Sequence, residues 1–151
     1  RIEESLTMAM SRNQQQLTWS TATSVTLSTN TESECDPIVF DASDVAALLQ
    51  IEVDNQGTPT SGDTLTVRIK PTLGDNNADA SDDYDTVEHC EQYLLDTVAA
   101  NFPGEDPARL SIPLNHLIAA KGLKIGVVWN SAAPGTRNAV VRGRLATLRA
   151  A

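Results

Sequence analysis

Few side chains in this 151-residue sequence could take part in acid–base chemistry at neutral pH. His89 and His116 are the two histidines, the residue type that titrates near neutrality. Cys90 is adjacent to His89, but neighbouring residues of a strand point to opposite faces, so there they cannot act as nucleophile and base. The sequence contains no Gly-x-Ser-x-Gly elbow, no Cys-x-x-Cys or His-x-x-x-His pair and no phosphate-binding loop. We therefore expect no enzymatic activity, no catalytic residue and no cofactor.

The acidic segment 75–85 is the one stretch whose spacing resembles a metal site. Four oxygen-bearing side chains stand at alternate positions: Asp75, Asn77, Asp79 and Ser81. Hard oxygen ligands at this spacing suit Ca²⁺, but Ala80 stands where an EF-hand loop needs glycine and Thr86 where it needs glutamate. We therefore prefer a solvated acidic loop and assign no metal site. A calcium ion that bridges two copies remains the alternative.

Trp19 and Trp129 are candidates for stacking against sugars in a carbohydrate-binding sandwich. Single tryptophans in alternating strands are more often core residues, and lectin behaviour would need an exposed aromatic patch. We expect both side chains in the core.

Any such side chain must be positioned by strands, because apolar and polar residues alternate along much of the chain. The clearest strands are 47–53 and 64–73, which flank the polar loop 54–63 and are interpreted as a two-stranded ribbon. Only one face of this ribbon is apolar, so a second layer must cover it.

The rest of the chain continues the strand pattern. Further strands are predicted within 17–30, 35–40, 86–101, 108–114, 121–130 and 139–148, and a short helical turn at 115–120. A helix competes with the strand at 86–101. About eight strands with few helices predict an all-β fold: a two-sheet antiparallel sandwich, jelly-roll-like, or a barrel.

The N-terminal stretch 1–16 differs from the rest in composition. It is rich in Glu, Met and Gln, which favour helix or no fixed structure, and it is too short to be a stable isolated helix. We interpret it as an arm that orders against a partner or a neighbouring copy, with a frayed tail as the alternative. Residues 17–151 are then the sandwich domain.

Charge is distributed unevenly along the chain. Residues 1–106 hold 20 acidic and 4 basic side chains (−16), residues 107–151 hold 7 basic and no acidic ones (+7), and the sum is −9. A net charge of this sign argues against nucleic acid as a main partner. Three interpretations stay open. Acidic and basic strands pair within one sheet; opposite poles of neighbouring copies meet; or a basic C-terminal face contacts DNA or an acidic protein.

Cys35 and Cys90 are too few for a disulfide framework and are expected to be reduced, small apolar residues, although pairing is left open. No apolar run approaches the ~20 residues of a membrane span, and no signal peptide is visible. We therefore expect no membrane partner.

Several phrases in the middle of the chain form a recognisable set. They are IEVDNQGTPTSGD at 51–63, TLTVRIKPTLGD at 64–75, DDYDT at 82–86, LLDTV at 94–98, DPAR at 106–109 and GLKIGVVWNSA at 122–132. Through them, residues 45–148 resemble tailed-bacteriophage β-sandwich virion proteins of the capsid decoration (cement) type.

This resemblance implies a non-enzymatic structural protein that binds the capsid surface and stabilises the shell. It further implies a place in the virion after assembly in the host cytoplasm. The partners would be the major capsid protein and copies of the chain itself, as a trimer or dimer. Another virion component (tail or connector) and a carbohydrate-binding module are the alternatives. The expected partner contacts are Ile2, Leu6, Met8 and Met10 on the arm, and Arg142, Arg144 and Arg149 on the final strand.

Overall fold

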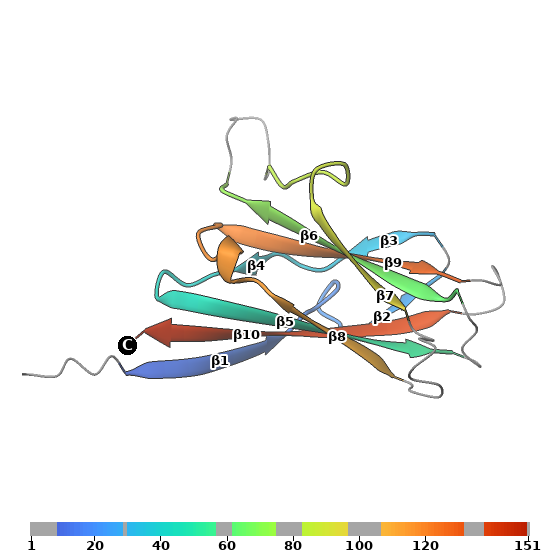
Figure 1. Ribbon diagram of the computed structural model, residues 1–151, viewed down its shortest axis with the longest axis horizontal. Helices are drawn as coiled ribbons and strands as arrows, with labels where there is room; N and C mark the ends of the chain where they lie inside the picture. The colour runs from blue at the N-terminus through green and yellow to red at the C-terminus, as the bar shows by residue number, and fades with distance from the viewer. Residues whose placement is uncertain are drawn as a thin grey trace, which may run out of the picture.

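Two antiparallel sheets pack face to face in the computed structural model of this chain (Figure 1). The structure describes residues 9–28, 30–56, 62–74, 83–96, 107–131 and 138–150. Within these ranges the elements are β1 (Met10–Gln16), β2 (Val25–Leu27), β3 (Glu32–Glu34), β4 (Ile38–Val39), β5 (Asp44–Asn55), β6 (Thr64–Thr72), β7 (Glu91–Asp96), β8 (Ala108–Pro113), the 3₁₀ turn η1 (Asn115–Leu117), β9 (Gly122–Asn130) and β10 (Ala139–Ala150).

The strand order identifies a jelly roll. One sheet has the order β1–β10–β5–β8, and β2 also pairs with β10; the other has the order β3–β9–β6–β7, and β4 also pairs with β9. Because β1 and β2 run along the same edge of β10, they are two parts of one interrupted strand, and β3 and β4 are likewise two parts of another. With each interrupted strand counted once, the described residues form eight strands. Numbered 1 to 8 along the chain, these strands have the orders 1-8-3-6 and 2-7-4-5 in the two sheets, which are the orders of a double Greek key. The predicted jelly-roll-like sandwich is confirmed.

The predicted ribbon is wrong in its pairing, although its alternation is correct. β5 pairs with β10 and β8, whereas β6 pairs with β7 and β9, so the chain between them crosses from one sheet to the other. The apolar faces of the two strands meet in the core: Leu49, Ile51 and Val53 from β5, and Leu65, Val67 and Ile69 from β6. Alternation determines which face of a strand is buried but not which strand lies beside it.

The N-terminal stretch is also corrected in part. Met10–Gln16 is a strand rather than a helix or an unstructured segment, because it pairs along the whole C-terminal half of β10. Tertiary pairing here overrides the helical preference of a Gln-rich sequence. Residues 1–8 lie outside the described residues, so an arm there stays a prediction.

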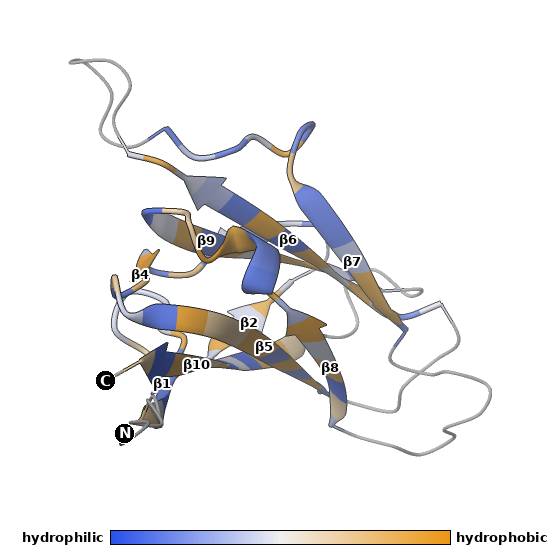
Figure 2. Cartoon of the chain, turned by 60° about the vertical axis from the view of Figure 1, so that its left-hand side comes forward, coloured by the Kyte–Doolittle hydropathy of each residue, from blue (hydrophilic) through white to orange (hydrophobic). Residues whose placement is uncertain are grey.

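Most of the other predicted elements are present in the structure. Of the predicted strand 86–101, residues 91–96 form a strand rather than a helix, but residues 87–90 form a turn, so His89 and Cys90 do not lie on opposite faces of a strand. The 3₁₀ turn falls inside 115–120 as expected. β3 was not predicted. Apolar and polar residues alternate along β6, β8 and β10 (Figure 2). The core that results includes Trp19 and Trp129, as predicted, and neither cysteine is in a disulfide.

Candidate interaction surface

The outer face of the β1–β10–β5–β8 sheet is the candidate interaction surface. Along β10, every second side chain from Ala139 to Leu145 points into the core, which leaves Arg142 and Arg144 exposed on the outer face. Small or apolar residues at the inward positions therefore fix the arginines outward. We call this face the outer A face.

One half of the outer A face is polar and cationic. Arg144 lies in register with Gln16 of β1 and Gln50 of β5. Arg142 lies in register with Glu52, whose Oε2 accepts a hydrogen bond from Arg109 Nε at 3.0 Å. These side chains and Thr23 surround a shallow hollow of about 230 Å³. No described residue forms an ion pair with Arg142 or Arg144, so their charges are available to a partner.

The other half of the outer A face is mainly apolar, although Arg12 lies in register with Leu148 there. Leu48 is 46% exposed and Leu148 is 37% exposed, and Ala46 lies in register with Leu148. A second hollow of about 240 Å³ lies between them, with Pro113 and Ala146 also at its wall. Met10, 43% exposed, pairs with Ala150 at the same end of the sheet. An apolar area next to unpaired cations is typical of a protein-binding surface rather than a catalytic site.

The structure brings together three of the seven predicted contact residues. Met10, Arg142 and Arg144 share the outer A face, whereas Arg149 does not. Arg149 Nε donates to Asp44 Oδ1 at 2.6 Å, and this hydrogen bond raises the pKa of the guanidinium. The Asp44 side chain is buried, so Arg149 has a structural role. Ile2, Leu6 and Met8 lie outside the described residues.

Leu48 and Leu148 were not among the predicted contacts, because the contacts predicted outside the N-terminal arm were all arginines. Leu48 precedes Leu49, so one of two adjacent leucines in a strand must point outward. That pair was the available signal. Arg109 belongs to β8, and only the register with β5 shows that it reaches the same surface.

The outer face of the opposite sheet is largely neutralised from within. Glu32 accepts hydrogen bonds from Arg68 Nη1 and Lys70 Nζ, and Lys70 Nζ also donates to Glu34 Oε2 at 3.1 Å. Partial burial lowers the pKa of Lys70, but the hydrogen bonds to Glu32 and Glu34 outweigh it and leave the pKa raised. Together with the Arg109–Glu52 and Arg149–Asp44 pairs, this cluster favours the interpretation that acidic and basic strands neutralise each other.

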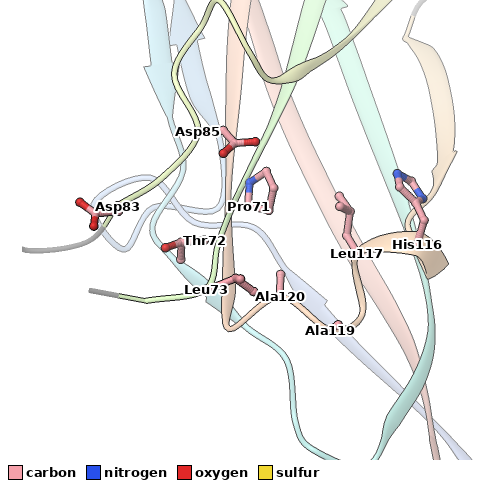
Figure 3. Close-up of a pocket in the computed structure, with 9 residues that line it drawn as sticks. All are labelled: Pro71, Thr72, Leu73, Asp83, Asp85, His116, Leu117, Ala119 and Ala120. Atoms are coloured by element: carbon pink, nitrogen blue, oxygen red, sulfur yellow. The ribbon is translucent and has the colours of Figure 1, made fainter. Parts of the chain in front are cut away.

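A cleft of about 370 Å³ lies at one end of the sandwich, where Figure 3 shows its lining. Pro71, Leu73, Leu117 and two alanines form apolar walls, and Asp83 and His116 stand at opposite ends. His116 Nε2 lies 2.7 Å from Glu91 Oε1. The lining residues that could act as nucleophiles, Thr72, Asp83 and Asp85, lie toward the other end of the cleft from His116 (Figure 3).

The remaining chemical candidates do not converge. His89 lies in a turn, where its N–H donates to the Thr86 carbonyl at 3.1 Å. Within the described ranges, no three His, Cys, Asp or Glu side chains are grouped as a metal ion would require. Residues 75–82 of the proposed calcium loop lie outside those ranges, so that alternative stays a prediction. No described helix is long and apolar enough to span a bilayer.

Comparisons with known proteins give distant structural likenesses. No family model and no curated protein matches this sequence. Among solved structures, the chain is similar to one described as "Crystal Structure of FLHE", with a TM-score of 0.40 and 14% identity over 94% of this chain and 98% of that one. It is also similar to a chain in "Structure of infectious bursal disease virus Gt strain", with a TM-score of 0.46 and 15% identity over 92% of this chain and 32% of that one. Neither TM-score reaches 0.5, so no functional conclusion follows from these likenesses.

Proposed function

We propose that this chain is a non-enzymatic virion structural protein that binds a capsid surface through the outer A face and stabilises the shell. The observation that carries the proposal is the combination, on one sheet face, of exposed leucines with two arginines that have no ion-pair partner among the described residues. The resemblance of residues 45–148 to phage decoration proteins supports the same role, and the jelly roll is an architecture that capsid domains use.

The chemistry of the outer A face indicates the kind of partner. Leu48 and Leu148 need an apolar surface to cover them, and Arg142 and Arg144 need carboxylates or carbonyl oxygens. A protein lattice offers both in a repeated arrangement. The major capsid protein is therefore the proposed partner and the virion the proposed location. A tail or connector component would use the same face, so these virion roles differ in position and not in chemistry.

The carbohydrate-binding alternative loses its two proposed platforms. Trp19 is almost buried and Trp129 is fully buried, so neither ring can stack on a sugar without unfolding. We keep the absence of nucleic-acid, membrane and cofactor partners as part of the proposal.

The test is attachment of the purified chain to shells assembled from the major capsid protein of the virus that encodes it. Sedimentation of shells should carry down many copies of the wild-type chain. We expect the double variant Arg142→Glu, Arg144→Glu and the single variant Leu48→Asp to lose attachment.

Matched controls come from the opposite sheet. Leu94, 66% exposed on β7, and Lys124 on β9 lie on the outer face of that sheet. Leu94→Asp and Lys124→Glu should therefore attach as the wild type does. Failure of the wild-type chain to attach, or equal loss in the control variants, would overturn the proposed role of the outer A face.

A further inference from the structure

β1 is an open edge of its sheet. The strand Met10–Gln16 pairs with β10 on one side, and no described strand pairs with its other side. Its register with β10 is continuous over all seven residues, without a bulge, and the strand contains no proline. A long and regular edge of this kind can pair with a further strand.

The hydrogen-bonding direction of each residue in β1 follows from its continuation. Leu17 N donates to Gly143 O at 2.8 Å, so odd-numbered residues of this run exchange hydrogen bonds with β10. The N–H and C=O groups of Arg12, Gln14 and Gln16 must then point toward the open edge. Three residues thus present a row of donors and acceptors that the rest of the described chain does not use.

The edge strands β3, β7 and β8 oppose pairing with their own copies, and the edge strands β2 and β4 have only three and two residues. The opposing residues are Glu32 and Glu34 in β3, Glu91 and Asp96 in β7, and Pro113 in β8. An antiparallel copy of β3 or β7 would place two carboxylates opposite each other, and proline cannot donate to a ladder. β1 has a single charge, on Arg12, among uncharged amide side chains. It is therefore the edge best suited to self-pairing.

We propose that β1 pairs antiparallel with β1 of a second copy, so that two sheets become one across a two-fold axis. In the register centred on Asn13, Arg12 lies opposite Gln14 of the second copy and Met10 lies opposite Gln16. No like charges meet, and the amide side chains can bond across the junction. An isologous pairing of this kind closes on itself as a dimer.

The dimer would make the two outer A faces continuous, because the side chains of Arg12, Gln14 and Gln16 lie on the same face as Arg144. Two binding faces in one rigid body would raise avidity for a repeated lattice. The pairing itself does not depend on what the outer A face binds.

Proline at position 14 is the direct test. Gln14→Pro removes an N–H that points to the open edge, whereas Gln15→Pro removes one that bonds to β10. Light scattering after size exclusion should give twice the chain mass of 16.2 kDa for the wild type and for Gln14→Ala, which keeps its N–H. It should give the mass of one chain for Gln14→Pro. The melting temperature of Gln14→Pro should stay close to that of the wild type, which shows that the chain is still folded. Gln15→Pro should instead lower the melting temperature. Gln16→Pro repeats the test in case Gln14→Pro does not fold.

Disulfide cross-linking tests the same β1–β1 interface independently. Asn13 would face its own copy across a non-hydrogen-bonded pair, where two Cβ atoms come close enough for a disulfide. In a Cys90→Ser background, Asn13→Cys should form an intermolecular disulfide on mild oxidation, and Val45→Cys, exposed elsewhere on the sheet, should not. A monomeric wild-type chain, or a dimer that survives Gln14→Pro and Gln16→Pro, would overturn the proposal. Loss of the dimer with retained shell attachment would separate this inference from the proposed function.

Discussion

At the scale of single residues, the Lys70 side chain is only 7% exposed, and its ion pair with Glu32 allows it to stay charged. Replacing Glu32 with glutamine leaves Glu34 as the charged partner of the Lys70 ammonium among the described residues. It also weakens the contact between residue 32 and Arg68. We expect the free energy of unfolding to fall by about 1–2 kcal/mol, since the cluster is partly open to water. Urea denaturation measures this change. Glu34→Gln is the control and should cost less, because Glu34 is the more exposed of the two glutamates.

The same cluster makes stability depend on pH. Partial burial raises the pKa of Glu32, but hydrogen bonds from Lys70 and Arg68 outweigh it, so the pKa in the folded chain lies below its ordinary value of 4.5. A carboxyl with a pKa depressed by folding stabilises the fold above its unfolded pKa, and this contribution is lost as pH falls through the folded pKa. The difference in free energy of unfolding between the wild type and Glu32→Gln should therefore have its full size at neutral pH. It should shrink as the pH falls well below 4.5. A difference that stays constant into acid would contradict the assignment.

The three arginines of β10 should separate into two classes. Arg149→Ala leaves the buried Asp44 carboxylate without its guanidinium donor, and among the described residues the Asp41 N–H, at 2.8 Å, is the donor that remains. We expect a clearly lower melting temperature for this variant. Arg144→Ala and Arg142→Ala should melt as the wild type does and should change attachment only. Thermal melts of the three variants side by side make the comparison, and equal losses of stability would count against it.

At the scale of elements, the close packing of Leu17, where β1 ends, requires a glycine at position 143. A Cβ atom at position 143 would lie 2.6 Å from Leu17 Cδ1 and 3.0 Å from Ile51 Cδ1, and Leu17 is fully buried where β1 ends. Gly143→Ala should therefore destabilise the fold by about 1–3 kcal/mol through overpacking. In a Leu17→Ala background the added methyl group fills part of a cavity, so the same change should be neutral or stabilising. Urea denaturation of the four chains tests this sign reversal; simple additivity would refute the packing argument.

The sequence predicts single elements better than it predicts their partners. Strict alternation marks both β5 and β6, because each buries one face in the shared core. Their separation into two sheets depends on pairings with β10 and β9, which are distant in sequence. β1 lacks an apolar face of its own and forms because β10 offers it an edge, so no local pattern could reveal it. The candidate surface follows the same rule: Arg142 and Arg144 could be found from β10 alone, but Arg109 joins them only through sheet register.

At the scale of the whole molecule, the charge of the chain and the charge of its outer A face have opposite signs. The chain carries −9 in total, yet the outer A face presents Arg12, Arg109, Arg142 and Arg144 against two acids of β5, Glu52 and Asp54. On the opposite sheet, Glu32 is paired with Arg68 and Lys70, and Glu34 is paired with Lys70. The outer A face is thus cationic in a chain of negative net charge, which orients the molecule as it approaches an acidic surface.

This distribution of charge predicts which side chains control the association rate of attachment to a shell and which control the dissociation rate. Exposed charges steer encounter and are screened by salt, with a Debye length of about 8 Å at physiological ionic strength. Apolar contacts act mainly on the dissociation rate. The association rate should therefore fall as salt is raised, and Arg142→Gln with Arg144→Gln should reduce that salt dependence. Leu48→Ala should leave the association rate unchanged and speed dissociation. Surface plasmon resonance on immobilised shells resolves both rates, and a salt-independent association rate in the wild type would show that the arginines do not face the partner.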